Sequence, residues 1–229
     1  MEIPRTVPVM TLRSATLFPQ ALLPLHIFEP RYRRMLADAL RADRMLSIAM
    51  QRPDRSRETP CAVAGLGLIR VSVDHADGTS HLILQGLTRV ELGEKVQQRP
   101  YRIHSIRPLR SARSESVATE ALVAKVHELV EERIGLGGLP FPFPGQKSPK
   151  SKHSGLATPP SVSANDILKY LRGVPDADQL ADLISCALLP GAEERQAILE
   201  TVDLEPRLRR LIRFLMAEID QHRKNPALD

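Results

Sequence analysis

The sequence predicts an α+β protein in which a barrel-like sheet of short strands, with one intercalated helix, is followed by a helical bundle. Apolar residues make up 42% of the 229 residues, which is enough for a core. Up to residue 113 they alternate in short runs, as in a strand, and from Ser114 they recur every three or four residues, as in a helix. We therefore expect two subdomains, 1–113 and 114–229, joined near residues 109–116.

The first subdomain is expected to open with two strands and a helix. Val7, Val9 and Leu12 alternate as in a strand, and residues 22–28 indicate a second strand. Pro24 within that run is typical of an edge strand or a bulge. A helix is expected from Pro30, because proline is favoured in the first turn. Its predicted apolar stripe consists of Tyr32, Met35, Leu36, Ala39 and Leu40.

The sheet is expected to continue with a short strand at 45–50 and a hairpin. The hairpin comprises residues 61–74 and 80–87, and Asp77-Gly78 supplies the turn between them. Glycines 65, 67 and 86 lie inside these strands, where glycine marks a bulge or a tight bend of a curled sheet. Further strands are expected at 89–96 and 101–109. Many short strands around one helix predict a small barrel.

The second subdomain is expected to be helical apart from one long loop. The expected helices cover residues 116–134, 163–172, 177–188, 191–200 and 204–222. Residues 139–163 contain six prolines together with serine and lysine, and we predict that they form a mobile loop.

Several classes of protein are excluded by composition and motifs. No apolar run approaches the ~18 residues of a membrane span, and the first ten residues lack the apolar core of a secretory signal. The two cysteines, Cys61 and Cys186, are too far apart in sequence for a disulfide framework or a cysteine zinc site. We therefore expect a cytoplasmic protein that does not contact a membrane.

Motifs for catalysis and cofactor binding are missing. None of the seven histidines has a partner at the four-residue spacing of helical metal ligands, and there is no Gly-x-Ser-x-Gly elbow. Residues 145–148 lack the glycines of a phosphate-binding loop. The sequence therefore predicts no catalytic residue, no metal and no cofactor, and gives no support for an enzyme.

Three segments of the first subdomain together resemble the N-terminal domain of Lon proteases. They are VPVMTLR at 7–13, FP at 18–19 and LPLHIFEPRY at 23–32. The hairpin adds similar segments at 65–69, 77–79 and 84–89. The helical half adds 181–184, 188–190, 196–200 and 204–208. The resemblance covers about residues 7–220 in order, and it implies a PUA-like pseudo-barrel followed by a helical bundle.

The resemblance also implies a function, because this unit of Lon proteases helps to recognise substrates. The chain ends at Asp229, with no room for an ATPase module or a Ser–Lys proteolytic domain, so we expect a stand-alone, non-catalytic module. Its expected partners are unfolded or extended protein segments, with a separate protease or ATPase as a further candidate. The candidate contact residues, at the junction of a loop, the Pro24 strand and the helix, are Leu17, Phe18, Leu23, Leu25, Phe28 and Tyr32. Ordinary core packing is the alternative role for each.

RNA binding is the alternative function, because PUA-like barrels include RNA readers. The chain carries a net charge of +5, and residues 99–113 contain five arginines and no acid. These candidate phosphate contacts are Arg99, Arg102, Arg107, Arg110 and Arg113. Tyr101 is the one aromatic residue within this stretch, which gives little for base stacking.

Overall fold

The computed structural model describes residues 2–55, 58–111, 116–137 and 164–224, which divide into two compact units. The sheet unit comprises Met1–Ala112 with Gly191–Asp203, and the helical unit comprises Arg113–Pro190 with Leu204–Asp229. The predicted α+β class is confirmed. The strands are β1 (Thr6–Leu12), β2 (Leu22–Ile27), β3 (Met45–Met50), β4 (Val63–Asp74), β5 (Ser80–Gln97) and β6 (Arg102–Leu109). The helices are α1 (Pro30–Arg41), α2 (Val117–Gly135), α3 (Ala164–Arg172), α4 (Ala177–Leu188), α5 (Ala192–Glu200) and α6 (Leu204–Lys224).

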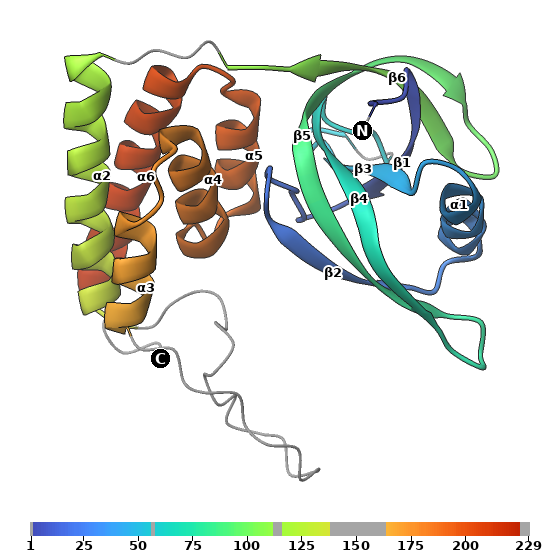
Figure 1. Ribbon diagram of the computed structural model, residues 1–229, viewed down its shortest axis with the longest axis horizontal. Helices are drawn as coiled ribbons and strands as arrows, with labels where there is room; N and C mark the ends of the chain where they lie inside the picture. Colours follow the sequence, from blue (N-terminus) through green and yellow to red (C-terminus); the bar gives the residue numbers. More distant parts are fainter. Residues whose placement is uncertain (1, 56–57, 112–115, 138–163, 225–229) are drawn as a thin grey trace, which may run out of the picture. The chain divides into compact units, whose positions relative to one another are not determined.

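The sheet curls into a barrel that is closed by its longest strand. The strand order is β2-β5-β4-β3-β1-β6, and β6 also pairs with β5. Residues 80–85 of β5 pair with β2, whereas residues 89–97 pair with β6 (Figure 1). Where we expected two strands, at 80–87 and 89–96, the chain therefore forms one strand of 18 residues. β2 lies at the edge of the sheet, as Pro24 predicted.

Helix α1 makes the connection between parallel neighbours in this sheet. β1 and β3 run parallel, and α1 lies between them in the chain, as a parallel crossover requires. The predicted apolar stripe is confirmed, because Tyr32, Met35, Leu36 and Ala39 are buried. They pack in a core with residues of the strands, including Leu46, Ile48 and Leu84.

The three predicted strand glycines lie beneath the segment that precedes β2. A Cβ atom on Gly65 or Gly86 would collide with the backbone carbonyl of Leu17 or Phe18, respectively. Gly67 faces the Leu17 and Leu84 side chains, next to a register shift between Leu66 and Gly67 that is the predicted bulge. The glycines therefore allow Leu17 and Phe18 to lie directly on the sheet.

Helix α5 belongs to the sheet unit, which corrects the expected assignment of residues 191–203 to the helical subdomain. The Gln196 amide Nε2 donates a hydrogen bond to the Val63 carbonyl at 2.9 Å. The buried Arg89 of β5 donates through Nε to the Leu199 carbonyl at 3.0 Å. A side chain from each of the two elements thus donates a hydrogen bond to a backbone carbonyl of the other, between residues more than one hundred positions apart in sequence.

Helices α2 and α6 run side by side in the helical unit (Figure 1). The helix expected at 116–134 is α2, and Ser116 caps it by accepting a hydrogen bond from the Thr119 amide at 3.1 Å. Near the other end of α2, the buried Arg133 contacts Glu218 of α6 at 3.2 Å. Arg207, which is 1% exposed, joins α6 to Asp178 and Asp182 of α4 at 2.9 and 3.2 Å.

The predicted mobile loop at 139–163 lies outside the described residues. Within the described part of the chain, no helix is both long enough and apolar enough to cross a membrane.

Candidate functional site

The solvent-facing side of β2, β5 and β4 carries aligned apolar residues. Pro24 of β2 pairs with Ile83 of β5, and Ile83 pairs with Val71 of β4. The next row, two residues further along, joins His26, His81 and Val73 in the same way. Side chains two apart on a strand point to the same face, so these rows form one surface. They line a shallow hollow of about 410 Å³.

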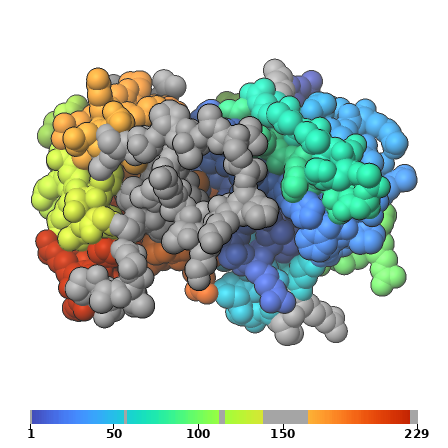
Figure 2. Space-filling model, turned by 90° about the horizontal axis from the view of Figure 1, so that it is seen from below, coloured from blue at the N-terminus to red at the C-terminus, as the bar shows by residue number. Residues whose placement is uncertain are grey.

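Exposed apolar side chains are concentrated on this surface. Ten large hydrophobic residues of the described chain are exposed, and five of them gather here. We call the outer apolar face the set Leu22, Pro24, Phe28, Val71, Val73 and Ile83. In the space-filling view the teal surface of the β4–β5 hairpin borders the blue surface of the first forty residues (Figure 2). A contiguous apolar surface of this kind marks an interaction site more often than scattered exposed residues do.

Three histidines bound one end of the outer apolar face. His75 Nε2 and His81 Nδ1 share a hydrogen bond of 2.8 Å, and the rings of His26 and His81 have their centroids 4.7 Å apart. The Phe28 ring lies 5.7 Å from the His26 ring. The surface therefore ends in imidazole rings, whose nitrogens can donate and accept hydrogen bonds. In the described residues, no three His, Cys, Asp or Glu side chains are arranged to hold a metal ion.

The free edge of β2 borders the outer apolar face. Among the described strands β2 pairs only with β5, so its second edge presents backbone groups that no strand of this sheet engages. Pro24 removes one backbone donor from the strand. An extended chain can add to such an edge through main-chain hydrogen bonds while its side chains contact the neighbouring face.

The six predicted contact residues divide between core and surface. Leu17, Phe18 and Tyr32 are at most 5% exposed, which corrects the expectation that they line a binding surface. Leu17 and Tyr32 belong to the core cluster, and the carbonyl of Phe18 lies against Gly86. Leu23 and Leu25 are half-buried and pack on that core from the inner side of β2. Phe28, at 60% exposed, is the one predicted residue on the outer apolar face.

The buried hydroxyl of Tyr32 joins α1 to β1 and to Glu58. It accepts from the Thr11 amide and lies 3.3 Å from Glu58, which also pairs with Arg31 and Arg102. Burial raises the pKa of Tyr32 to about 12, and the Glu58 charge acts in the same direction. Burial alone would raise the pKa of Glu58, but hydrogen bonds and charge from the two arginines lower it below its usual value.

The predicted phosphate contacts are partly neutralised. Arg102 is engaged by Glu58, and Arg107 Nε donates to Glu91 at 3.0 Å across the β5–β6 pair. Arg99 and Arg110 are exposed, and Arg113 lies outside the described residues. The stretch 99–113 has no acid in sequence, but the fold brings two acids to it. A phosphate would therefore compete with existing ion pairs for two of these arginines.

Periodicity does not identify Val71, Val73 and Ile83 as exposed residues of a binding surface. Val71 and Val73 alternate with the polar Ser72 and Asp74, so the period assigns the two valines to the buried side of β4. Ile83 lies between Leu82 and Leu84, in a run that is apolar on both faces of β5. One signal was available: the ends of β4 and β5 are rich in apolar residues, whereas a solvated face of an antiparallel sheet normally carries polar ones.

Sequence comparison assigns the family. The family of the ATP-dependent protease La (LON) substrate-binding domain matches residues 6–217, nearly the whole chain. This chain belongs to that family. The chain is 24% identical over 222 residues to the Lon protease of Dictyoglomus thermophilum, and 26% identical over 221 residues to Lon protease 2 of Myxococcus xanthus. The alignments cover 96% and 93% of this chain but 25% and 24% of those proteins, so it spans about a quarter of their length.

Solved structures share the fold of this chain. The N-terminal domain of a Mycobacterium avium complex Lon protease superposes with a TM-score of 0.70 at 19% identity, covering 92% of this chain and 98% of that one. A Lon N-terminal domain protein from Xanthomonas campestris gives 0.61 at 16% identity, covering 91% and 98%. The resemblance of the sequence to the N-terminal domain of Lon proteases is thereby confirmed, and the matched family is a substrate-binding domain.

Proposed function

We propose that this chain binds extended apolar segments of other proteins on the outer apolar face, next to the free edge of β2. The observation that carries the proposal is that β2 is both the outermost strand of this face and the strand with the free edge. Five exposed large hydrophobic residues gather on the face, and no described strand pairs with the second edge of β2. The face supplies apolar contacts and the edge supplies main-chain hydrogen bonds.

Main-chain pairing with β2 accounts for binding without strict sequence preference. A segment added to this edge alternates its side chains, so every second one lies next to Leu22, Pro24 and His26. Apolar side chains at those positions bury against the outer apolar face, at about 25 cal/mol per Å² removed from water. Polar segments gain the hydrogen bonds but not this term. Unfolded proteins, which expose apolar segments, are therefore the preferred class of client.

We further infer that bound segments are passed to a protease or an ATPase, in the same chain or a separate one. Support comes from the family, whose description names substrate binding for an ATP-dependent protease. The module itself acts without chemistry of its own, because its proposed contacts are apolar and main-chain groups. We also propose a cytoplasmic location, which is supported by Cys61 and Cys186 being thiols and not members of a disulfide.

A pair of matched substitutions tests the binding surface. Val73→Lys places a charge in the outer apolar face, and Val96→Lys places the same charge at a similarly exposed valine outside that face. The probe is reduced, carboxymethylated lactalbumin, an unfolded protein, titrated by fluorescence anisotropy. Val73→Lys should weaken binding about tenfold and Val96→Lys should leave it within twofold. Equal affinity of both variants would refute the assignment of this face.

A further inference from the structure

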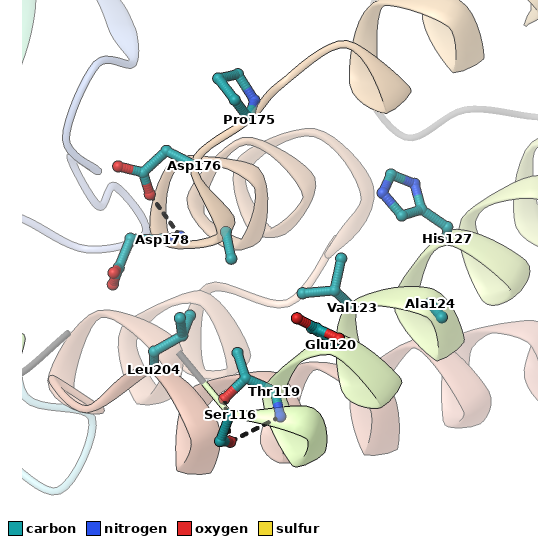
Figure 3. A pocket seen from close by; sticks show the side chains of 11 residues that line it. Ser116, Thr119, Glu120, Val123, Ala124, His127, Pro175, Asp176, Asp178 and Leu204 are labelled. Atoms are coloured by element: carbon teal, nitrogen blue, oxygen red, sulfur yellow. Dashed lines mark hydrogen bonds between the residues drawn. The ribbon is translucent and has the colours of Figure 1, made fainter. Parts of the chain in front are cut away.

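A groove of about 690 Å³ lies in the helical unit. One wall is the first half of α2, and the other is the start of α4 with the first residue of α6. Figure 3 shows the α2 side chains facing the first turn of α4 across this groove. α3 packs on α2 near Glu131, through Arg172, and among the described elements it does not extend over the first half of α2. The volume accommodates a few side chains, as ligand sites do.

The groove combines an apolar lining with charges of one sign. Val123, Ala124 and Leu204 contribute apolar surface. The charged side chains that line it are Glu120, Asp176 and Asp178, and His127 lies at one end. Among the residues that the structure describes, no lysine or arginine lines it, although the chain as a whole carries a net charge of +5. The negative charge of the groove is therefore a local feature and not a reflection of composition.

The carboxylates differ in how far they are already engaged. Asp176 caps α4 by accepting from the amides of Asp178 and Gln179 at 2.8 and 3.2 Å. Asp178 pairs with the buried Arg207, but that one guanidinium also serves the buried Asp182. The exposed Glu120 makes no side-chain hydrogen bond or ion pair with another described residue, and it lines the groove on the α2 side (Figure 3).

We infer that this groove binds a cationic apolar segment of a partner protein, with a leucine-sized side chain on the floor and a neighbouring lysine or arginine against Glu120 and Asp176. Charge complementarity selects this occupant, because a cation gains attraction from Glu120 and Asp176, the two carboxylates of the lining that are not in the ion pair with Arg207. A neutral apolar segment leaves that attraction unused, and an acidic segment or a nucleic acid is repelled. The inference is independent of the sheet surface, since every lining residue lies in the helical unit.

Two synthetic peptides and the full chain provide the test. The probe is a fluorescein-labelled twelve-residue peptide of leucine and lysine, and its counterpart replaces every lysine by glutamate. Ala124→Trp fills the groove from an exposed helix position, whereas Ala121→Trp puts the same side chain on α2 outside the lining. Glu120→Lys reverses a lining charge, and Glu128→Lys makes the same change outside the lining.

The lysine peptide should bind, and the glutamate peptide should bind at least tenfold more weakly. Ala124→Trp should reduce affinity for the lysine peptide at least tenfold, and Glu120→Lys about fivefold, while both controls stay within twofold. Val73→Lys should not change it, which separates this groove from the outer apolar face. Equal binding of the two peptides, or unchanged binding to Ala124→Trp, would overturn the inference. A dimer of the free chain that Ala124→Trp dissociates would overturn it too, by making a second copy the occupant.

Discussion

The backbone carbonyl of Phe18 occupies the space where a Cβ atom on Gly86 would stand, far inside the 3.0 Å that real Cβ atoms keep from other atoms. The same relationship holds between Leu17 and Gly65. Hydrogen bonds fix the approach, because the Gln20 amide donates to the Gly86 carbonyl at 2.9 Å and the Gly86 amide donates to Ala21 at 2.8 Å. The segment before β2 is thus held to the sheet by backbone contact, and this positions the edge strand.

Replacing Gly86 by alanine should therefore destabilise the sheet unit. The added methyl group must displace backbone, which costs about 2–4 kcal/mol of unfolding free energy. Gly135→Ala is the control, because its Cβ meets nothing within 4 Å and it lies at the end of α2. Denaturant unfolding followed by circular dichroism measures both. A Gly86→Ala protein as stable as Gly135→Ala would contradict the close approach.

Loss of Asp182 should destabilise the helical unit much more than loss of an exposed acid. Asp182→Ala removes one of the two acids that pair with the buried Arg207 and costs about 2–3 kcal/mol, because a buried hydrogen bond between charged groups is lost while Asp178 remains. Glu205→Ala breaks the exposed pair with Arg209 and should cost less than about 1 kcal/mol. Thermal unfolding of the two variants gives the comparison, and similar losses would show that Arg207 does not depend on this acid.

Alkaline titration should reveal the buried hydroxyl of Tyr32. Its pKa is about 12 in the folded protein and roughly 10 in an unfolded chain, so the folded state holds the proton more tightly. The resulting stability is present below pH ~10 and is lost as pH rises toward 12, by up to about 2–3 kcal/mol.

The phenylalanine variant isolates this effect from other titrating groups. The stability difference between wild type and Tyr32→Phe should shrink across that pH range, whereas the difference from Tyr170→Phe, which removes an exposed tyrosine, should stay constant. Urea unfolding at a series of pH values measures both differences. A constant difference for Tyr32→Phe would mean that this hydroxyl is not buried as described.

Local sequence signals were sufficient for most elements of the fold. Pro24 marked an edge strand, Ser116 the start of α2, and Asp77-Gly78 the hairpin turn, because each depends on the geometry of a few adjacent residues. The placement of α5 depends instead on Arg89 meeting Leu199, 110 positions along the chain. Periodicity carries no information about such a contact, so α5 was expected among the other helices.

The candidate site was harder to predict than the fold for a related reason. Of the residues chosen from sequence, Tyr32 and Phe28 look equally suited to binding, yet one is in the core and the other is exposed. Which side of a strand is solvated depends on what packs against it. Val71 and Val73 alternate with the polar Ser72 and Asp74, a pattern that assigns the valines to the buried side, and only the assembled sheet shows that they are exposed.

Chemical-shift mapping tests the central claim most directly. Backbone amide spectra of the isotopically labelled chain would be recorded while unlabelled carboxymethylated lactalbumin is added. If extended segments bind along β2 and the outer apolar face, shifts should concentrate at 22–28, 71–73 and 81–83, and residues 93–97 at the far end of β5 should stay unchanged. Shifts that avoid β2 and the hairpin, or that spread evenly over the sheet unit, would contradict the proposed function.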